Sequence, residues 1–215
     1  MVQTTTKLLI YQKVCMELGQ RTILSLSDTG PIASYTNVIY NDAVLFCLAQ
    51  GMWHTWAVRF VSIPASTDIE PQFGWTHAFD VPDDFVRIAE IADNDLMYPP
   101  LDLYDQVAGP GGNAFLANIG TLYLQYVSND PNYGLNMAGW SSEFADYVAT
   151  YIAWKICRQC GGSKQDADDL EKKVKRRHDD AASKDAADRP TGRLPPGNWT
   201  RARVGRRSFA FRQMV

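Results

Sequence analysis

The 215-residue sequence lacks long apolar runs, and this shortage excludes a membrane-spanning protein. Its longest uncharged apolar run, Ala43 to Ala49, covers seven residues, whereas a membrane-spanning helix needs about 20. Lys7 and Lys13 interrupt the only early apolar segment, so we expect neither a signal peptide nor a membrane partner. Hydrophobic residues make up 46% of the chain and charged residues 21%, which is typical of a soluble fold.

Cysteine and histidine are also scarce, with four and three residues respectively. The pair Cys157 and Cys160 has the C-x-x-C spacing, but no second C-x-x-C exists and the histidines (54, 77 and 178) follow no metal-ligand spacing. A redox motif would need a strand just before it, whereas this pair ends a helical pattern. We therefore predict packed cysteines in a protein folded in a reducing cytosol, with no metal and no cofactor.

The sequence contains no recognisable catalytic constellation. It has no G-x-S-x-G motif, and the Gly109–Gly112 segment lacks the Lys-Ser/Thr pair of a phosphate-binding loop. Asp83 and Asp84 are adjacent carboxylates after a proline, where turn formation is the usual role. We predict no catalytic residue and no enzymatic activity. A cell-wall hydrolase that uses Asp83 or Asp84, or Glu90, as its acid is a less favoured alternative.

Charge is distributed unevenly along the chain. The total is 21 basic and 24 acidic residues, but the segment from Arg189 to the end holds seven arginines, no lysine and no acid. Residues 1–188 therefore hold 14 basic and 24 acidic residues, a formal charge of −10 against +7 for the arm 189–215. Such asymmetry is typical of an interaction tail. Its candidate contact residues are Arg193, Trp199, Arg201, Arg203, Arg206, Arg207, Phe209 and Phe211.

The arm is compatible with two kinds of partner. Arginine and tryptophan dominate contacts in protein grooves, and arginines with aromatic residues also bind nucleic acid. Prolines, glycines and like charges predict that the arm becomes ordered only on a partner. A second basic run, Lys172–Arg177, is nearly neutralised by acids on both sides, so we interpret it as a solvated helix face.

Periodicity predicts an α+β fold: mainly a helical bundle of about four helices, with an antiparallel β-meander inserted between the second and third, and an extended C-terminal arm. Ser163 and Asp166 form a capping-box pattern at the start of the fourth helix. The third helix is apolar on most faces, which predicts a central position. The expected body is residues 1–188, with helices at 4–19, 34–56, 142–160 and 163–188 and the meander at 73–127.

The most informative stretch is Phe73-Gly-Trp-Thr-His-Ala-Phe-Asp-Val-Pro-Asp-Asp-Phe-Val-Arg-Ile88. Its apolar residues alternate before Pro82, which predicts a half-buried strand followed by a turn. Further along come Leu122-Tyr-Leu-Gln-Tyr126, Asn129-Asp-Pro131 and a long helix from Ser142. The order of these parts, over roughly residues 4–188, resembles the head-to-tail adaptors of tailed bacteriophages, the tail-tubular-protein-A or head-completion group.

This resemblance implies a structural virion protein, made in the host cytoplasm. Such adaptors form a ring, typically of twelve subunits, below the portal ring; they line the channel for double-stranded DNA and hold the next tail (nozzle) protein. The arm would bind the portal. The 99–118 region is longer than the family pattern, so its surroundings supply the candidate tail-facing residues Tyr98, Asp102, Asp105 and Asn113. A sequence-independent DNA-binding packaging accessory protein is the main alternative.

Overall fold

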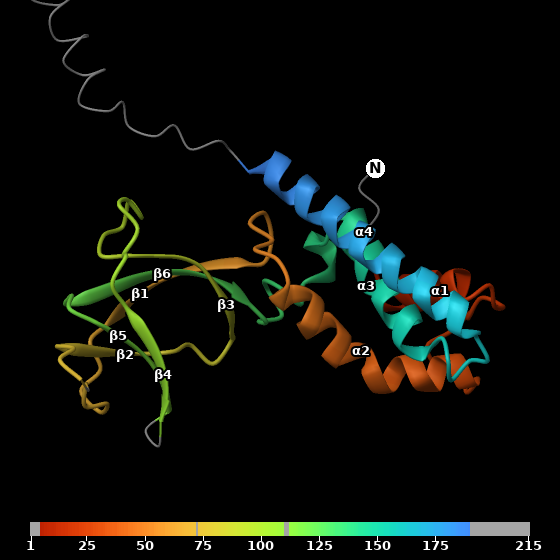
Figure 1. Cartoon of the computed structure of the whole chain (residues 1–215), viewed down its shortest axis with the longest axis horizontal. Helices are drawn as coiled ribbons and strands as arrows, with labels where there is room; N and C mark the ends of the chain where they lie inside the picture. Colours follow the sequence, from red (N-terminus) through yellow and green to blue (C-terminus); the bar gives the residue numbers. More distant parts are fainter. Residues whose placement is uncertain (1–4, 72, 110–111, 190–215) are drawn as a thin grey trace, which may run out of the picture.

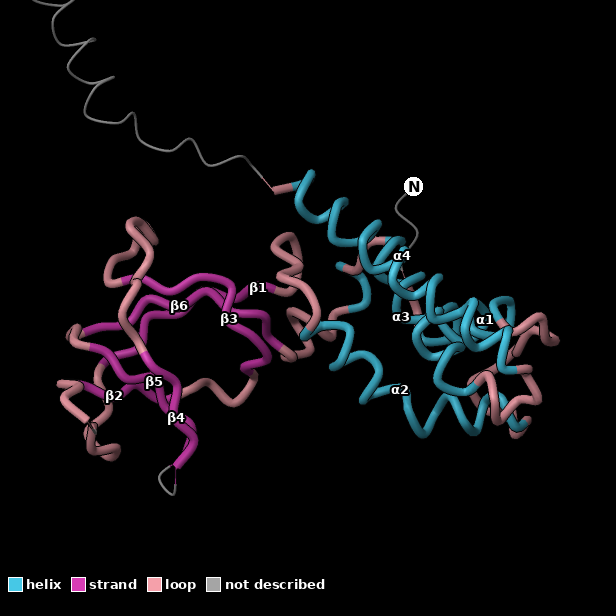
Figure 2. The backbone as a smooth tube through the Cα atoms, in the orientation of Figure 1, coloured by secondary structure: helices cyan, strands magenta, loops and turns pink. Residues whose placement is uncertain are grey.

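The computed structural model of the chain describes residues 5–71, 73–109 and 112–189, with helices at one end and strands at the other (Figures 1 and 2). The predicted α+β class is confirmed. The helices are α1 (Lys7–Glu17), α2 (Pro31–Ala49), the short 3-10 helix η1 (Met137–Gly139), α3 (Ser142–Ile156) and α4 (Lys164–Asp188). The strands are β1 (Val58–Pro64), β2 (His77–Asp80), β3 (Phe85–Ala92), β4 (Asp105–Gly109), β5 (Gly112–Ala117) and β6 (Thr121–Ser128). We call residues 58–128 the β lobe and the other described residues the helical lobe.

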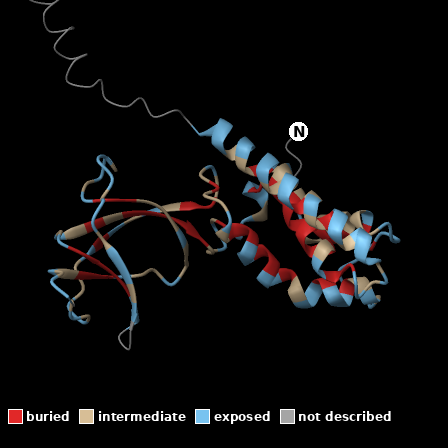
Figure 3. Cartoon of the chain, in the orientation of Figure 1, coloured by how far each residue is buried: buried red, intermediate tan, exposed pale blue. Residues whose placement is uncertain are grey.

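Helix α3 is the centre of the helical lobe, as its apolar faces predicted. It packs against α1, α2 and α4, and Phe144, Val148 and Ile152 are fully buried. Figure 3 shows buried stretches along α3 behind α4, whereas the outer faces of α4 are exposed. Burying the α3 side chains removes a large apolar area from water, which is the main stabilising contribution of such a core.

The helix ends follow from local capping. Thr6 accepts a hydrogen bond from the backbone N–H of Leu9 at 3.2 Å, so α1 begins just after the predicted threonines. The predicted capping box is confirmed, because Ser163 and Asp166 exchange hydrogen bonds at the start of α4. Helices α1 and α3 are shorter than predicted, ending at Glu17 and Ile156.

The prediction of a helix over 34–56 is wrong at its C-terminal end. Helix α2 ends at Ala49, and the chain then turns, with Trp53 in the left-handed region at φ 45°. The indole Nε1 of Trp53 donates to the Leu48 carbonyl at 3.0 Å, and a Cβ at Gly51 would collide with the Trp53 ring. The predicted helix extended through the tryptophans, but Trp53 packs inward from a turn, and strand β1 follows.

The β lobe is antiparallel throughout, as predicted, but it is not a single sequential meander. It contains two three-stranded sheets, with orders β1-β6-β3 and β2-β5-β4. The unpredicted β1 pairs with β6, which places the last strand between the first and the third. Alternation of side chains identifies strands but carries no information about which strands pair. The two sheets share one core that includes Phe79, Phe115, Leu124 and Tyr126.

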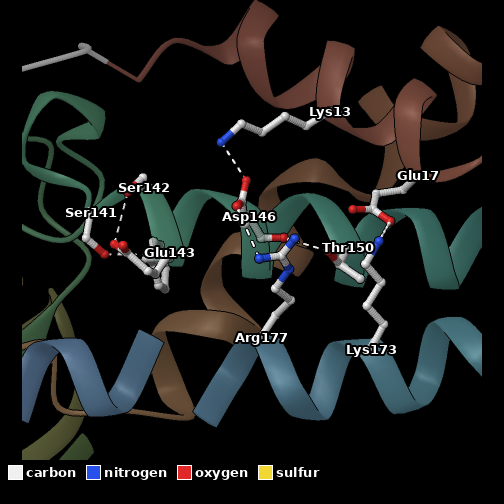
Figure 4. Close-up of polar contacts among 10 residues, drawn as sticks. Lys13, Glu17, Ser141, Ser142, Glu143, Asp146, Thr150, Lys173 and Arg177 are labelled. Carbon is white, nitrogen blue, oxygen red and sulfur yellow. Dashed lines mark hydrogen bonds and ion pairs between the residues drawn. The ribbon is translucent and has the colours of Figure 1, made fainter. Parts of the chain in front are cut away.

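Ion pairs fasten α4 to the rest of the helical lobe (Figure 4). Asp146 of α3 lies between Lys13 of α1, at 2.6 Å, and Arg177 of α4, at 3.5 Å. Lys173 of α4 pairs directly with Glu17 of α1 at 2.5 Å. These contacts supplement a narrow apolar stripe in which Leu170, Val174 and Ala181 are buried.

Candidate interaction surfaces

The turn after Pro82 contains a cluster centred on the carboxylate of Asp84. Arg59 of β1 donates its Nη1–H to Asp84 at 3.0 Å, and Tyr126 of β6 donates its hydroxyl at 2.8 Å. Ser128, at the end of β6, also donates its hydroxyl. The backbone carbonyl of Asp84 accepts from the N–H of Asn129 at 2.9 Å. One residue therefore connects the start of β3 to both of the other strands in its sheet.

The electrostatics of this cluster keep Asp84 ionised. Burial by itself would raise the pKa of the Asp84 carboxyl, but hydrogen bonds from Ser128, Tyr126 and Arg59 and the guanidinium charge outweigh it, so the pKa is lowered. Burial and the adjacent carboxylate raise the pKa of the Tyr126 hydroxyl. A general acid must carry a proton near neutral pH, so Asp84 is poorly suited to the acid role of the hydrolase alternative. Asp83 beside it is exposed.

The three histidines have structural contacts. His54 lies in the turn after α2, where its Nδ1 is 3.0 Å from the carboxylate of Asp185 on α4 and its backbone N–H donates to the same group at 3.1 Å. The ring of His178 packs edge-on against Trp53 and Tyr147. His77 starts β2, where its Nδ1 lies 2.9 Å from the hydroxyl of Thr76 and its ring lies beside that of Phe79.

The cysteine pair lies in the turn between α3 and α4. Cys157 is buried and Cys160 is half-buried, and both thiols are free. Burial raises the pKa of each thiol, which disfavours the thiolate that metal binding and redox exchange require. Within the described ranges, no group of three or more His, Cys, Asp or Glu residues could hold a metal ion. In the same ranges, no helix is long and apolar enough to cross a membrane.

The four candidate tail-facing residues are all exposed, but they do not form one patch. Tyr98 and Asp102 belong to the loop that follows β3, while Asp105 starts β4 and Asn113 lies on β5. Asp105 is paired with Leu116, and Asn113 with Ala108. Because the side chains of a strand alternate between faces, this register places Asp105 and Asn113 on opposite faces of the β4–β5 ladder. The loop and the far end of β4 also lie at opposite edges of the β lobe (Figure 1).

The predicted portal-binding residues lie outside the described part of the chain, which ends at Arg189. The other basic run, Lys172–Arg177, is described, and four of its five cations pair with carboxylates. The pairs are Lys172–Asp169, Lys173–Glu17, Lys175–Glu171 and Arg177–Asp146. Lys172 and Lys175 pair with acids of α4 itself, as the solvated-face interpretation predicted, whereas Lys173 and Arg177 pair with α1 and α3, which that interpretation did not predict.

The β lobe carries most of the net negative charge of residues 1–188, a feature that the sequence analysis missed. It holds ten carboxylates and two arginines, a formal charge of −8, and no lysine. The signal was present in the sequence, since no lysine occurs between Lys13 and Lys155. Both arginines have internal contacts: Arg59 binds Asp84, and Arg87 donates to the carbonyl of Ala49 at 3.2 Å. Eight of the ten carboxylates belong to exposed residues: Asp68, Glu70, Asp80, Asp83, Asp93, Asp95, Asp102 and Asp105.

Comparison with known proteins adds no family assignment. A scan against protein-family models finds no match, and a search of curated proteins finds no significant relative.

Proposed function

We propose that this chain is a head-to-tail adaptor of a tailed bacteriophage, a structural virion protein without catalytic activity or cofactor. The observation that carries the proposal is the Asp84 cluster. The Val-Pro-Asp-Asp turn belongs to the stretch that carries the resemblance to the adaptors. In this cluster the turn has a structural role, because Asp84 joins the three strands of one sheet. A motif that builds the fold suits a protein whose role is to hold a shape between two partners.

In the proposed assembly, twelve copies form a ring below the portal. Each subunit has a body of four packed helices with the β lobe inserted after the second, and the arm 189–215 reaches the portal. The surroundings of the 99–118 region would face the tail protein. Because the described candidates lie at two edges of the β lobe, we expect Tyr98 and Asp102 to contact a different part of the tail from Asn113.

The charge of the β lobe suits a wall along which DNA passes. Ten carboxylates without any lysine create a negative potential, and like charge keeps a polyanion from adhering. The paired basic run of α4 offers little free positive charge. On this proposal, DNA touches the ring transiently and is not bound by the body.

The decisive experiment mixes the purified chain with portal rings of the phage that encodes it and examines the particles by electron microscopy. We expect an additional ring of density on one end of the portal. A chain truncated after Arg189 serves as the control, since it keeps α4 and lacks the arm. Portal particles that stay bare with the full chain would refute the adaptor function.

The DNA-binding alternative makes a different measurement decisive. Several arginine–phosphate contacts release counterions, so DNA retention would fall steeply as salt increases. We expect the full chain to retain DNA weakly and only at low salt. A chain that lacks the arm should retain none. Tight retention at physiological salt, combined with bare portals, would favour the packaging accessory instead.

A further inference from the structure

The negative β lobe and the positive arm of the same chain have nearly equal and opposite charges. The lobe carries −8, while the arm carries +7 and contains no acid. Within the described part of the chain, only two of the ten lobe carboxylates have an ion-pair partner: Asp84 with Arg59, and Glu90 with Arg189. The second of these partners is the first residue of the arm.

The structure places the start of the arm against the β lobe. Helix α4 directs its C-terminal end toward the lobe (Figure 1), and the Nη2 of Arg189 lies 3.6 Å from the Glu90 carboxylate on β3. Glu90 is 29% exposed and Arg189 is 49% exposed, so the pair lies at the surface, where the following residues of the arm have access.

A groove of 350 Å³ opens at the same position. It lies between the last turns of α4 and the turn that follows α2, and Arg189 is part of its wall. The wall of the groove also includes Met52, Arg87, Ala182 and Ala186. The arm continues from this wall with Leu194, Pro195, Pro196 and Trp199, which are apolar side chains of the kind that fill such a groove.

The arm is long enough to cover the lobe. Its 26 residues after Arg189 could span about 85 Å when extended, whereas an eight-residue strand such as β3 is about 26 Å long. A segment attached at the edge of its binding surface has an effective concentration on the order of millimolar. Individually weak, exposed arginine–carboxylate pairs can therefore act together within one molecule.

We propose that residues 190–215 bind the acidic surface of the β lobe of their own molecule. Leu194, Pro195, Pro196 and Trp199 occupy the groove beside Arg189, and the later arginines pair with exposed carboxylates such as Asp93 and Asp95. This proposal revises the expectation from the sequence that the arm becomes ordered only on a partner, because a portal must then compete for an arm that is already bound. This interaction belongs to the free protein, so it can be tested without any portal and does not depend on the adaptor function.

The test places a photoreactive benzoylphenylalanine at position 199 of the full chain, in place of Trp199. At about 50 mM salt, where surface charges are weakly screened, we expect crosslinks to residues 50–54, 182–186 or 85–105. The crosslinked protein should keep the mobility of a single chain in denaturing gels. At about 500 mM salt the yield should fall at least threefold, because short-range screening weakens exposed pairs.

Two charge variants sharpen the test. Glu90→Gln removes the partner of Arg189 and should lower the crosslink yield at least twofold. Asp42→Asn is the matched control, because Asp42 is an exposed acid of α2 and lies outside the β lobe; its yield should stay within the error of the parent. Circular dichroism would verify that both variants keep their fold.

Three outcomes would overturn the proposal. The first is an absence of crosslinks to the three segments. The second is a crosslink that joins two chains at every protein concentration, which would assign the arm to a second copy. The third is a crosslink yield that is equal for the two charge variants and insensitive to salt.

Discussion

Replacing Asp84 by alanine should destabilise the β lobe more than any change at the adjacent Asp83. The Asp84 carboxylate is the acceptor for the hydroxyls of Tyr126 and Ser128, which belong to residues with 1% and 0% exposure. Without it, both hydroxyls lose the buried acceptor of their hydrogen, although the Ser128 oxygen still accepts from the N–H of Asp130 at 3.0 Å, while the half-exposed Arg59 can turn to water. Asp83→Ala is the matched control, because Asp83 is exposed.

The size of the effect follows from these contacts. A buried polar group left without a partner costs about 1–3 kcal/mol, so two of them cost about 2–6 kcal/mol. The ion pair with Arg59 adds little, because the Arg59 side chain is 39% exposed and pairs at the surface contribute about 0–1 kcal/mol, so we take about 2–6 kcal/mol for Asp84→Ala. In a chain of this size this range corresponds to a fall in Tm of roughly 4–24 °C. Asp83→Ala should stay within about 0.5 kcal/mol.

The measurement is urea and thermal unfolding of the three proteins, followed by circular dichroism, with Asp84→Asn added to isolate the charge. The pKa of Asp84 is lowered from its ordinary 3.8 in the folded protein. A lowered pKa contributes stability above 3.8 that is lost as pH falls through and below that value. The Tm difference between the parent and Asp84→Asn should therefore be largest near neutral pH and shrink below about pH 4. Equal stabilities of the Asp83 and Asp84 alanine variants, or a difference independent of pH, would refute this account.

Four further outcomes are expected. Gly134→Ala should lower the free energy of unfolding by about 1–3 kcal/mol, because the added Cβ would collide with the Ser128 carbonyl. Gly120→Ala is the control and should leave the free energy of unfolding unchanged, since the space around Gly120 is open. Chemical denaturation measures both variants. Ser163→Ala removes the α4 cap and should cost about 1 kcal/mol in the same assay; an unchanged free energy of unfolding would contradict this. Chelator should leave the melting curve unchanged, and stoichiometric zinc by elemental analysis would contradict this. Light scattering of the free chain should give a monomer at micromolar concentration, since α4 exposes charged faces that drive association poorly; a stable ring without portal would contradict it.

The sequence predicted those parts of the fold that depend on local chemistry. The capping box at Ser163, the proline stop after β2 and the central, apolar α3 follow from side chains within a few residues of each other. The predicted end of α2 was wrong because the resemblance carried the second helix through the tryptophans, whereas α2 ends at Ala49 and the backbone of Trp53 is left-handed at φ 45°. Strand β1 was missed for the same reason, and with it the strand order, which is set by pairing over more than sixty positions, such as Val58 with Val127.

The candidate contact surfaces were predictable to a lesser degree. Exposure of the residues near Tyr98 and Asp102 follows from the polar, proline-rich composition of their loop. The division of Asp105 and Asn113 between two faces does not, because it depends on the register of β4 with β5. Two adjacent aspartates look equivalent in sequence, but only Asp84 meets Arg59, Tyr126 and Ser128, which come from 25 to 44 positions away. Long-range contacts of this kind decide which carboxylate is structural.

The distribution of arginine and lysine connects the fold with both proposals. The β lobe contains no lysine, and its two arginines are held by Asp84 and by the carbonyl of Ala49. The lobe therefore has no spare cation of its own to compensate eight exposed acidic residues. The arm supplies seven arginines, and arginine forms the bidentate carboxylate pairs that lysine cannot. On the two proposals together, a portal that binds the arm would remove this compensation from the lobe. Residues 1–188 would then be left with a formal charge of −10. Attachment would thus uncover the negative wall at the moment when DNA is to pass along it.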